Sequence, residues 1–188
     1  MMDGMELLLL SNSRTAAGFL VDYLAEIRDF AGTARKAAFI PFASVQRPWP
    51  EFTRMVGDAL QHFDLLKECR NRGLMEKIRE RAEAGMPYLG WSAGSNLACP
   101  TIKTTNDMPI VDPGSLEALG LLPLPAPRRV RRGQPRDAGA RASRGDWLRV
   151  SGARIELKGP DEAVWFHGES RVPVNPGTLF APSIPSQP

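Results

Sequence analysis

The sequence has few cysteines, few histidines and no long apolar run. Its two cysteines, Cys69 and Cys99, make no disulfide framework, which favours a reducing, cytoplasmic setting. The opening residues MMDGMELLLLSNS lack the positive start and the longer apolar stretch of a signal peptide. No run approaches the ~18 apolar residues of a membrane helix, so we expect no membrane partner.

The net positive charge of the chain comes from one segment. The net charge is +3, but the segment Pro125–Gly145 holds seven arginines and a single acidic residue, Asp137. The basic balance therefore says little about the partners of the fold as a whole. These arginines have neither interleaved aromatic residues nor a helical or strand period. We expect no nucleic-acid partner.

The length of 188 residues suits one domain with its own core. Short buried strands alternate with amphipathic helices in the first half, which predicts a parallel sheet covered by helices. One expected helix is twice the usual ~11–12 residues, and Gly32 and Gly73 are expected to end helices. The expected strands are Glu6–Leu10, Lys36–Phe42 and Met86–Leu89, and the expected helices are Phe19–Phe30, Trp49–Arg72 and Leu74–Ala84.

The C-terminal part of the chain has a different pattern. WLRVSGARIEL and AVWFHGESRVPV alternate apolar and polar residues around turn residues, which predicts antiparallel hairpins. Residues 125–145 are expected to be irregular and residues 176–188 to form a loose tail, because neither stretch offers much to a core. We expect residues 1–188 to form a single α/β domain.

The stretch Gly90-Trp91-Ser92-Ala93-Gly94 fits the G-x-S-x-G pattern of a nucleophile elbow. An apolar strand precedes it, and a short helix, Ala93–Cys99, is expected after it. Ser92 would then stand at the carboxyl end of a strand, with the Ala93 backbone N–H directed at a developing oxyanion. The alternative interpretation is an ordinary glycine-rich turn.

A nucleophilic serine needs a base, usually a histidine that a carboxylate orients. Asp107, on the loop after the elbow helix, is the nearest acid, although it can equally be a turn residue of TTND. His62 lies in a helical pattern and His167 on a hairpin strand, so a structural role is the simpler interpretation of each. Cys99 is a weaker candidate nucleophile, because a small thiol on a helix usually belongs to a core.

Several blocks of the sequence resemble the peptidase E family of serine peptidases. The blocks are MELLLLSNS, AAFIPFA, LLKECRNRGL, GWSAGSNLACPTIKTTNDMPIVDP and, more weakly, GDWLRVSG. The resemblance implies a three-layer, mainly parallel α/β fold of the class I glutamine-amidotransferase type, with helices on both faces. It implies hydrolysis of dipeptides with an N-terminal aspartate, without a metal or organic cofactor. Ser92 matches the family's nucleophile and Asp107 its proposed triad aspartate.

Three departures from the family bear on activity. A strand and a GGGNT-type loop, which supplies part of the family's oxyanion hole, have no counterpart before LLKECRNRGL, as if deleted near Asp58. Arg129 stands at the position of the family's catalytic histidine, and a guanidinium cannot accept the serine proton. Arg144 takes the place of a family glutamate. We interpret the segment from Pro125 to about Ser143, which good matches flank, as a shifted reading frame or a sequencing artefact.

These departures leave the function open between an enzyme and a binding protein. The first interpretation is an aspartyl dipeptidase with impaired activity. The second is an inactive homologue that binds aspartyl peptides or a partner. The related cyanophycin-degrading enzymes share the elbow and the aspartyl preference, and they give a third interpretation. Labelling of Ser92 by a serine-reactive probe separates the enzymes from the binding protein.

Overall fold

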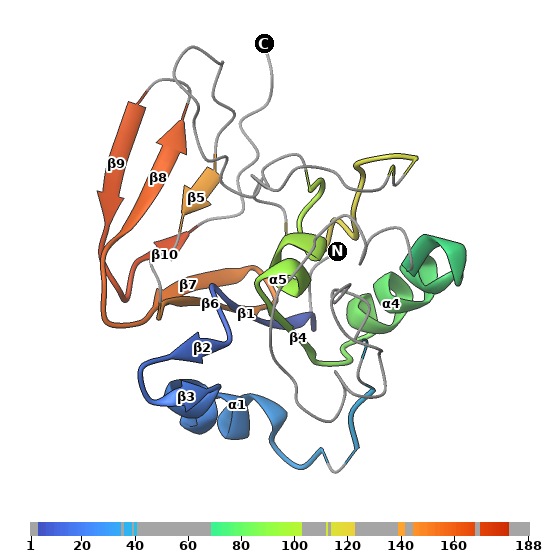
Figure 1. Ribbon diagram of the computed structural model, residues 1–188, viewed down its shortest axis with the longest axis horizontal. Coiled ribbons are helices and arrows are strands. Elements are labelled where there is room, and N and C mark those ends of the chain that lie inside the picture. Colours follow the sequence, from blue (N-terminus) through green and yellow to red (C-terminus); the bar gives the residue numbers. More distant parts are fainter. Residues whose placement is uncertain are drawn as a thin grey trace.

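A five-stranded sheet forms the centre of this mixed α/β structure. The computed structural model describes residues 4–34, 36–38, 40, 69–102, 112, 114–122, 139–141, 145–167 and 170–180. The strand order is β10-β7-β6-β1-β4 (Figure 1). The five strands are β1 (Glu6–Leu10), β4 (Tyr88–Trp91), β6 (Trp147–Ser151), β7 (Arg154–Lys158) and β10 (Leu179–Phe180).

Only one pairing among the described strands of this sheet is parallel. Strand β1 runs parallel to β4, from Leu7 opposite Tyr88 to Leu10 opposite Trp91, while the pairings β1–β6, β6–β7 and β7–β10 are antiparallel. The prediction of a mainly parallel sheet is therefore wrong for the described strands. The physical reason is that a strand of the C-terminal hairpin, β6, occupies the second edge of β1. Residues 36–38 and 40, expected in a second parallel strand, are loop.

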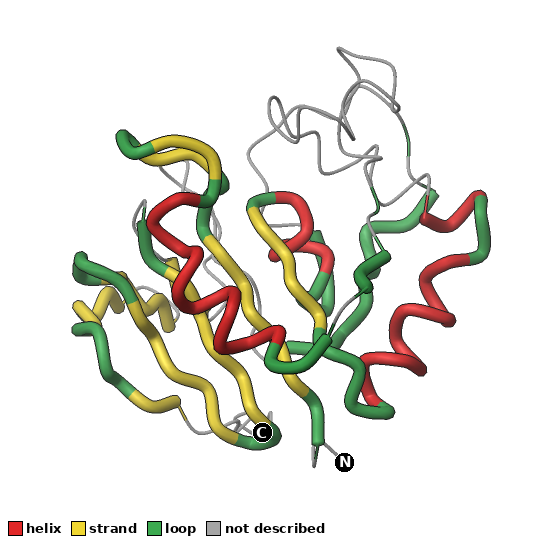
Figure 2. The backbone as a smooth tube through the Cα atoms, turned by 90° about the horizontal axis from the view of Figure 1, so that it is seen from below, coloured by secondary structure: helices red, strands yellow, loops and turns green. Residues whose placement is uncertain are grey.

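Strand β1 is buried on both faces, as its run of leucines predicts. Leu7 and Leu9 pack with residues of α4 (Leu74–Glu83) and α5 (Ala93–Leu97). Leu8 and Leu10 pack on the opposite face with residues of α1 (Leu24–Ala31). Figure 1 shows α1 and α5 on opposite sides of the sheet, and Figure 2 shows α1 crossing one face. The expectation of helices on both faces is confirmed for the described elements.

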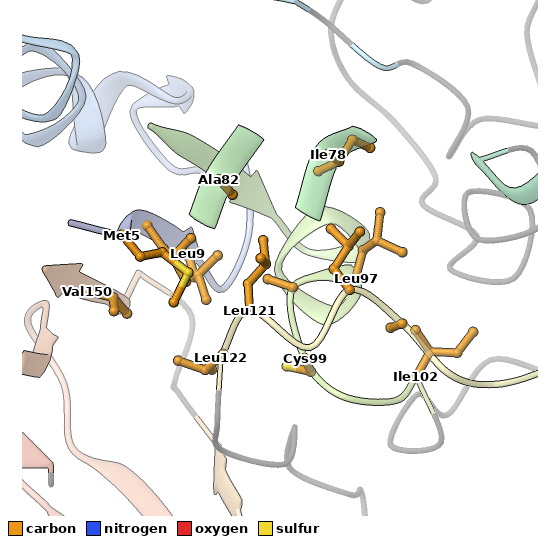
Figure 3. Close-up of a cluster of buried hydrophobic side chains, with 14 of the residues drawn as sticks. Met5, Leu9, Ile78, Ala82, Leu97, Cys99, Ile102, Leu121, Leu122 and Val150 are labelled. Carbon is orange, nitrogen blue, oxygen red and sulfur yellow. The ribbon is translucent and has the colours of Figure 1, made fainter. Parts of the chain in front are cut away.

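The larger core cluster lies between the sheet, α4 and α5. Figure 3 shows Leu9 of β1 and Val150 of β6 gathered with Ile78 of α4 and Leu97 of α5. Leu121, Leu122 and other residues of the segment 114–122 complete the cluster. Burial of such side chains contributes about 1.5–3 kcal/mol each. This packing fixes α5, and therefore the turn that leads into it, against the sheet.

The described helices end close to their predicted bounds. Helix α1 ends at Gly32 (φ 52°), but it begins later than expected, after the 3₁₀ turn η1 (Val21–Tyr23), because Leu20 is left-handed (φ 57°). Gly73 (φ 62°) separates α4 from the helical residues 69–71, as predicted. Residues 49–68 of the expected long helix lie outside the described residues. No helix in the described part of the chain is long and apolar enough to cross a membrane.

The C-terminal strands form the predicted hairpins. Strand β6 pairs with β7, and β8 (Ala163–His167) pairs with β9 (Ser170–Val174), both antiparallel. Strand β5 (Gly139–Arg141) pairs with β8, whereas residues 125–145 were expected to be irregular. Strand β10 pairs with β7, whereas residues 176–188 were expected to form a loose tail. The remaining strands, β2 (Arg14–Thr15) and β3 (Gly18–Phe19), pair with each other.

Candidate active site

Ser92 occupies the sharp turn between β4 and α5. Its backbone angles are φ 47° and ψ −106°, and it is one of two described non-glycine residues with positive φ. Such a conformation costs on the order of 1–3 kcal/mol and persists only where the surroundings impose it. The turn ends the parallel strand β4, so Ser92 lies at the carboxyl edge of the β1–β4 pair. The predicted strand–serine–helix geometry is therefore present.

Gly90 allows β4 and α5 to approach closely. A Cβ atom on Gly90 would lie 2.7 Å from the carbonyl carbon of Gly94 and 2.8 Å from the backbone nitrogen of Ser95. These contacts are with backbone atoms, which cannot rotate away. The first glycine of the motif is thus required by the packing of the first turn of α5 on β4.

The carbonyl oxygen of Leu10 binds the elbow from the neighbouring strand. It accepts the backbone N–H of Ser92 at 3.1 Å and the Ser95 hydroxyl at 2.7 Å. The Ser95 oxygen also lies 3.0 Å from the Gly90 carbonyl oxygen. The last residue of β1 therefore holds both the amide of Ser92 and the first turn of α5.

Tyr88 holds the same helix from β4. Its hydroxyl donates to the carbonyl oxygen of Gly94 at 2.7 Å. Burial, followed by the nearby Cys69 and Cys99, raises the pKa of Tyr88 far above 10, so this hydroxyl keeps its proton. On the opposite face of the sheet, Trp91 packs edge-on against Phe19, with ring centroids 6.0 Å apart. Helix α5, after Ser92, is thus held on one face of the sheet, and Trp91, directly before Ser92, packs on the other.

The hydroxyl of Ser92 and the backbone N–H of Ala93 belong to adjacent residues of this turn. Ser92 is half-buried, and no described residue forms a hydrogen bond with its hydroxyl. Ala93 is the first residue of α5, where a backbone N–H has no helical carbonyl to bind. Within the described residues, the turn therefore places a serine hydroxyl beside a backbone N–H that no helical carbonyl accepts, and acyl transfer uses groups of these two kinds.

Asn12 organises the loop that follows β1. Its Oδ1 accepts hydrogen bonds from the Tyr23 hydroxyl at 2.5 Å, the Ser11 hydroxyl at 3.2 Å and the Gly145 backbone N–H at 3.2 Å. Tyr23 is fully buried, and burial raises its pKa above 10. Since β1 and β4 are parallel, this loop leaves the sheet at the same edge as Ser92. The sequence analysis missed Asn12 and Tyr23, and the polar SNS directly after an apolar strand was the available signal.

Asp146 is a second residue that the sequence analysis did not identify. It is fully buried, its carboxylate accepts the Asp161 backbone N–H at 3.1 Å, and its carbonyl oxygen accepts the Ser11 N–H at 3.0 Å. It joins the start of β6 to the loop after β1. Through these hydrogen bonds Asp146 stabilises the loop at the carboxyl end of β1.

Asp107, the predicted acid of the site, lies outside the described residues, as do Arg129 and Arg144, which stand at positions of family residues, and His62, which was expected to be structural. Their roles stay predictions. His167 ends β8, in the three-stranded sheet β5-β8-β9, whereas Ser92 follows the five-stranded sheet. Nothing in the described geometry brings His167 to Ser92.

Cys99 is not a nucleophile in this arrangement. It is 4% exposed, and burial raises the pKa of its thiol from 9.0 to about 12. Its sulfur lies 3.6 Å from the carbonyl oxygen of Ser95, and the side chain belongs to the main core cluster. The thiolate is the reactive form of cysteine, so a thiol with this pKa is inert near neutral pH. Within the described ranges, no group of three His, Cys, Asp or Glu residues could hold a metal ion.

This chain is similar in sequence to a family of peptidases. The family model described as Peptidase family S51 matches residues 61–137, which include the elbow. Peptidase E of Salmonella arizonae is 35% identical over 229 residues, covering 94% of this chain and 100% of the relative. Peptidase E of Salmonella typhimurium and that of Shigella flexneri serotype 5b align with the same identity and coverage.

The lengths of these alignments bear on the predicted deletion. Each spans 229 residues and the whole relative, whereas this chain has 188 residues. The relatives therefore contain residues that have no counterpart here. An internal deletion, as inferred from the missing GGGNT-type loop, agrees with this difference.

Proposed function

Because this chain belongs to peptidase family S51, the family of peptidase E, we propose that it hydrolyses dipeptides with an N-terminal aspartate and that Ser92 is the nucleophile. The observation that carries the proposal is the positive φ of Ser92, between a parallel strand and a helix. A strained residue at this position has a cost that folding alone does not require. Nucleophilic attack by the hydroxyl of this half-buried serine would account for the conformation.

The proposed reaction begins with attack of the Ser92 oxygen on the peptide carbonyl carbon. The carbonyl oxygen gains negative charge, and the Ala93 backbone N–H stabilises that charge by a hydrogen bond. The C–N bond then breaks, and the leaving amine takes up the proton that the Ser92 hydroxyl gives up, while the aspartyl group remains on Ser92 as an ester. Attack of water on this ester releases aspartate and regenerates the serine.

The step for which this chain lacks a family residue is removal of the proton from Ser92. Asp107 is the proposed acid of the catalytic group, by its match to the family. The residue at the position of the family's histidine is Arg129, which holds its proton at any working pH. We therefore propose that turnover is lower than in the peptidase E relatives. The missing GGGNT-type loop adds to this loss, since one oxyanion donor contributes ~10²–10³ in rate.

A second candidate function is binding without hydrolysis. The replacement of the catalytic base by Arg129 favours it, because an intact elbow without a base still offers the Ala93 N–H to a substrate carbonyl. The cyanophycinase-like alternative keeps the same nucleophile and changes only the substrate. We also propose that all 188 residues form one domain of the class I glutamine-amidotransferase type in the cytoplasm, on the ground of family resemblance.

The test is an Asp-Leu hydrolysis assay on the full chain, with one of the peptidase E relatives measured beside it. We expect turnover at least ~10²-fold below the relative, abolished in Ser92→Ala, and raised in Arg129→His because an imidazole can accept the serine proton. Ser151→Ala is the control, since it removes a serine hydroxyl at the opposite end of β1. Binding of Asp-Leu by a folded protein with no Ser92-dependent turnover would favour the second candidate. Failure to bind or cleave Asp-Leu would reject both.

A further inference from the structure

The side chain of Ser95 bonds outside its own helix. Ser95 is the third residue of α5, so the carbonyl four residues earlier, which a serine inside a helix commonly binds, belongs to Trp91 of β4. Ser95 instead reaches the carbonyl oxygen of Leu10 on the neighbouring strand, 85 residues away in sequence, at 2.7 Å. Its oxygen also lies 3.0 Å from the Gly90 carbonyl oxygen, so one hydroxyl spans β1, β4 and α5.

We propose that Ser95 and Tyr88 are positioning residues that keep Ser92 in its reactive conformation, with positive φ. The proposal rests on the proposed role of Ser92 as nucleophile. Ser95 acts through the Leu10 carbonyl, which also accepts the backbone N–H of Ser92 at 3.1 Å. Tyr88 acts through the carbonyl oxygen of Gly94, at 2.7 Å.

The two hydroxyls restrain the first turn of α5 from two strands. Ser95 ties it to the end of β1, and Tyr88 ties it to β4. The Ser92 carbonyl lies between these ties and accepts the Asn96 N–H at 3.0 Å. Without either hydroxyl, the turn would be free to relax from φ 47° toward an ordinary conformation.

Relaxation of this turn would affect the reaction more than substrate binding. The Ser92 oxygen and the Ala93 N–H move with the first turn of α5, and both act on the carbonyl in the transition state. A displacement of the nucleophile by as little as ~1 Å costs up to ~10²-fold in rate. The loss should therefore appear in kcat, with KM little changed.

The experiment compares Ser95→Ala, Ser95→Thr and Tyr88→Phe in the full chain, with Ser151→Ala as the matched control. Ser151 donates to Glu6 Oε1 at the opposite end of β1, so its loss removes a serine hydrogen bond that lies away from the turn. Two readouts are taken. Hydrogen exchange by NMR reports the amides of Ser92 and Asn96, and Asp-Leu hydrolysis gives kcat and KM.

We expect Ser95→Ala and Tyr88→Phe to speed exchange at both amides by about fivefold or more, the factor that a net hydrogen bond of ~1 kcal/mol implies. Ser95→Thr keeps the hydroxyl and should restore slow exchange, and Ser151→Ala should leave it unchanged. In kinetics, kcat should fall at least about threefold while KM stays within about twofold. Unchanged exchange in Ser95→Ala and Tyr88→Phe, or a loss confined to KM, would overturn the proposal.

A failure of the proposed function remains distinguishable from a failure of this inference. If the wild-type chain shows no Ser92-dependent hydrolysis, the proposed function is rejected, and the exchange rates still decide whether the two hydroxyls hold the turn. If hydrolysis is present and exchange is unaffected by either variant, the proposed function survives and the positioning role is rejected.

Discussion

A Cβ atom on Gly90 would lie 2.7 Å from the carbonyl carbon of Gly94, a separation that no real Cβ contact adopts. A Cβ atom on Gly94 would meet no such close contact. A Cβ atom on Gly94 would have the Tyr88 hydroxyl, at 3.9 Å, as its nearest neighbour, an ordinary contact distance. The two glycines of the motif therefore have different roles, and only the first is required by close packing.

This asymmetry predicts different effects for two matched substitutions. Gly90→Ala should lower the free energy of unfolding by about 1–3 kcal/mol, because the strand and helix must separate to fit the methyl group. Gly94→Ala should lie within about 1 kcal/mol of wild type, since alanine fits and is favoured in a helix. Urea unfolding of both variants checks the prediction. Equal destabilisation by the two would contradict it.

The positive φ of Ser92 predicts an order of stability among variants at this position. Ser92→Gly should raise the free energy of unfolding by about 1 kcal/mol relative to Ser92→Ala, because glycine adopts φ 47° without a Cβ clash. Both variants should lose all Ser92-dependent hydrolysis. Thermal unfolding of the two side by side gives the comparison. An alanine variant as stable as the glycine variant would show that the turn stores no strain.

The contact between Asn12 and Tyr23 predicts an unequal cost for removing either partner. Tyr23→Phe should lower the free energy of unfolding by about 1 kcal/mol, since Asn12 Oδ1 keeps the Ser11 and Gly145 donors. Asn12→Ala should cost more, about 1–3 kcal/mol, because it leaves the buried hydroxyl of Tyr23 without this acceptor.

A double-mutant cycle measured by urea unfolding tests this coupling. Asn12→Ala combined with Tyr23→Phe should cost less than the sum of the two single changes, since residues that share a hydrogen bond are not additive. Strict additivity would show that the two side chains contribute independently.

Burial of Cys99 predicts a loss of stability at alkaline pH. Its pKa is raised from 9.0 to about 12, so below pH 9 the thiol is protonated in both states and its contribution is fully present. Between pH 9 and 12 the unfolded chain loses this proton first, and the free energy of unfolding falls by up to about 1.4 kcal/mol per pH unit. Tyr23 and Tyr88, whose pKa values lie above 10, act in the same direction at higher pH.

The contribution of Cys99 is isolated by comparing the pH dependence of wild type and Cys99→Ala. The alanine variant should be less stable at neutral pH because it leaves a cavity, but its stability should fall less steeply above pH 9. Thiol-reactive reagents should modify Cys99 of the native protein only after unfolding. Rapid native-state labelling at pH 8, or parallel pH curves, would show that the thiol is not held neutral by burial.

Much of the site could be predicted because it depends on residues that are close in sequence. The apolar strand before Ser92, the glycine two residues earlier and the helix after it specify a tight turn by local conformation. The leucines of β1 predict a strand buried on both faces, and Gly32 and Gly73 end helices because they adopt positive φ. Such patterns depend on backbone geometry over a few residues, which the sequence displays directly.

The choice of neighbours required the tertiary structure. Periodicity indicates that β1 is buried, but it does not say that β6 of a later hairpin pairs with it, so the sheet is less parallel than expected. The hydrogen bond from Ser95 to Leu10 spans 85 residues, and that from Gly145 to Asn12 spans 133. The sequence around a hydroxyl or an amide is the same whichever distant group it binds, so it does not reveal the partner. The sequence by itself determined the strand–serine–helix turn at Ser92, and the folded chain decided which groups hold it, because those groups meet only when the strands pair.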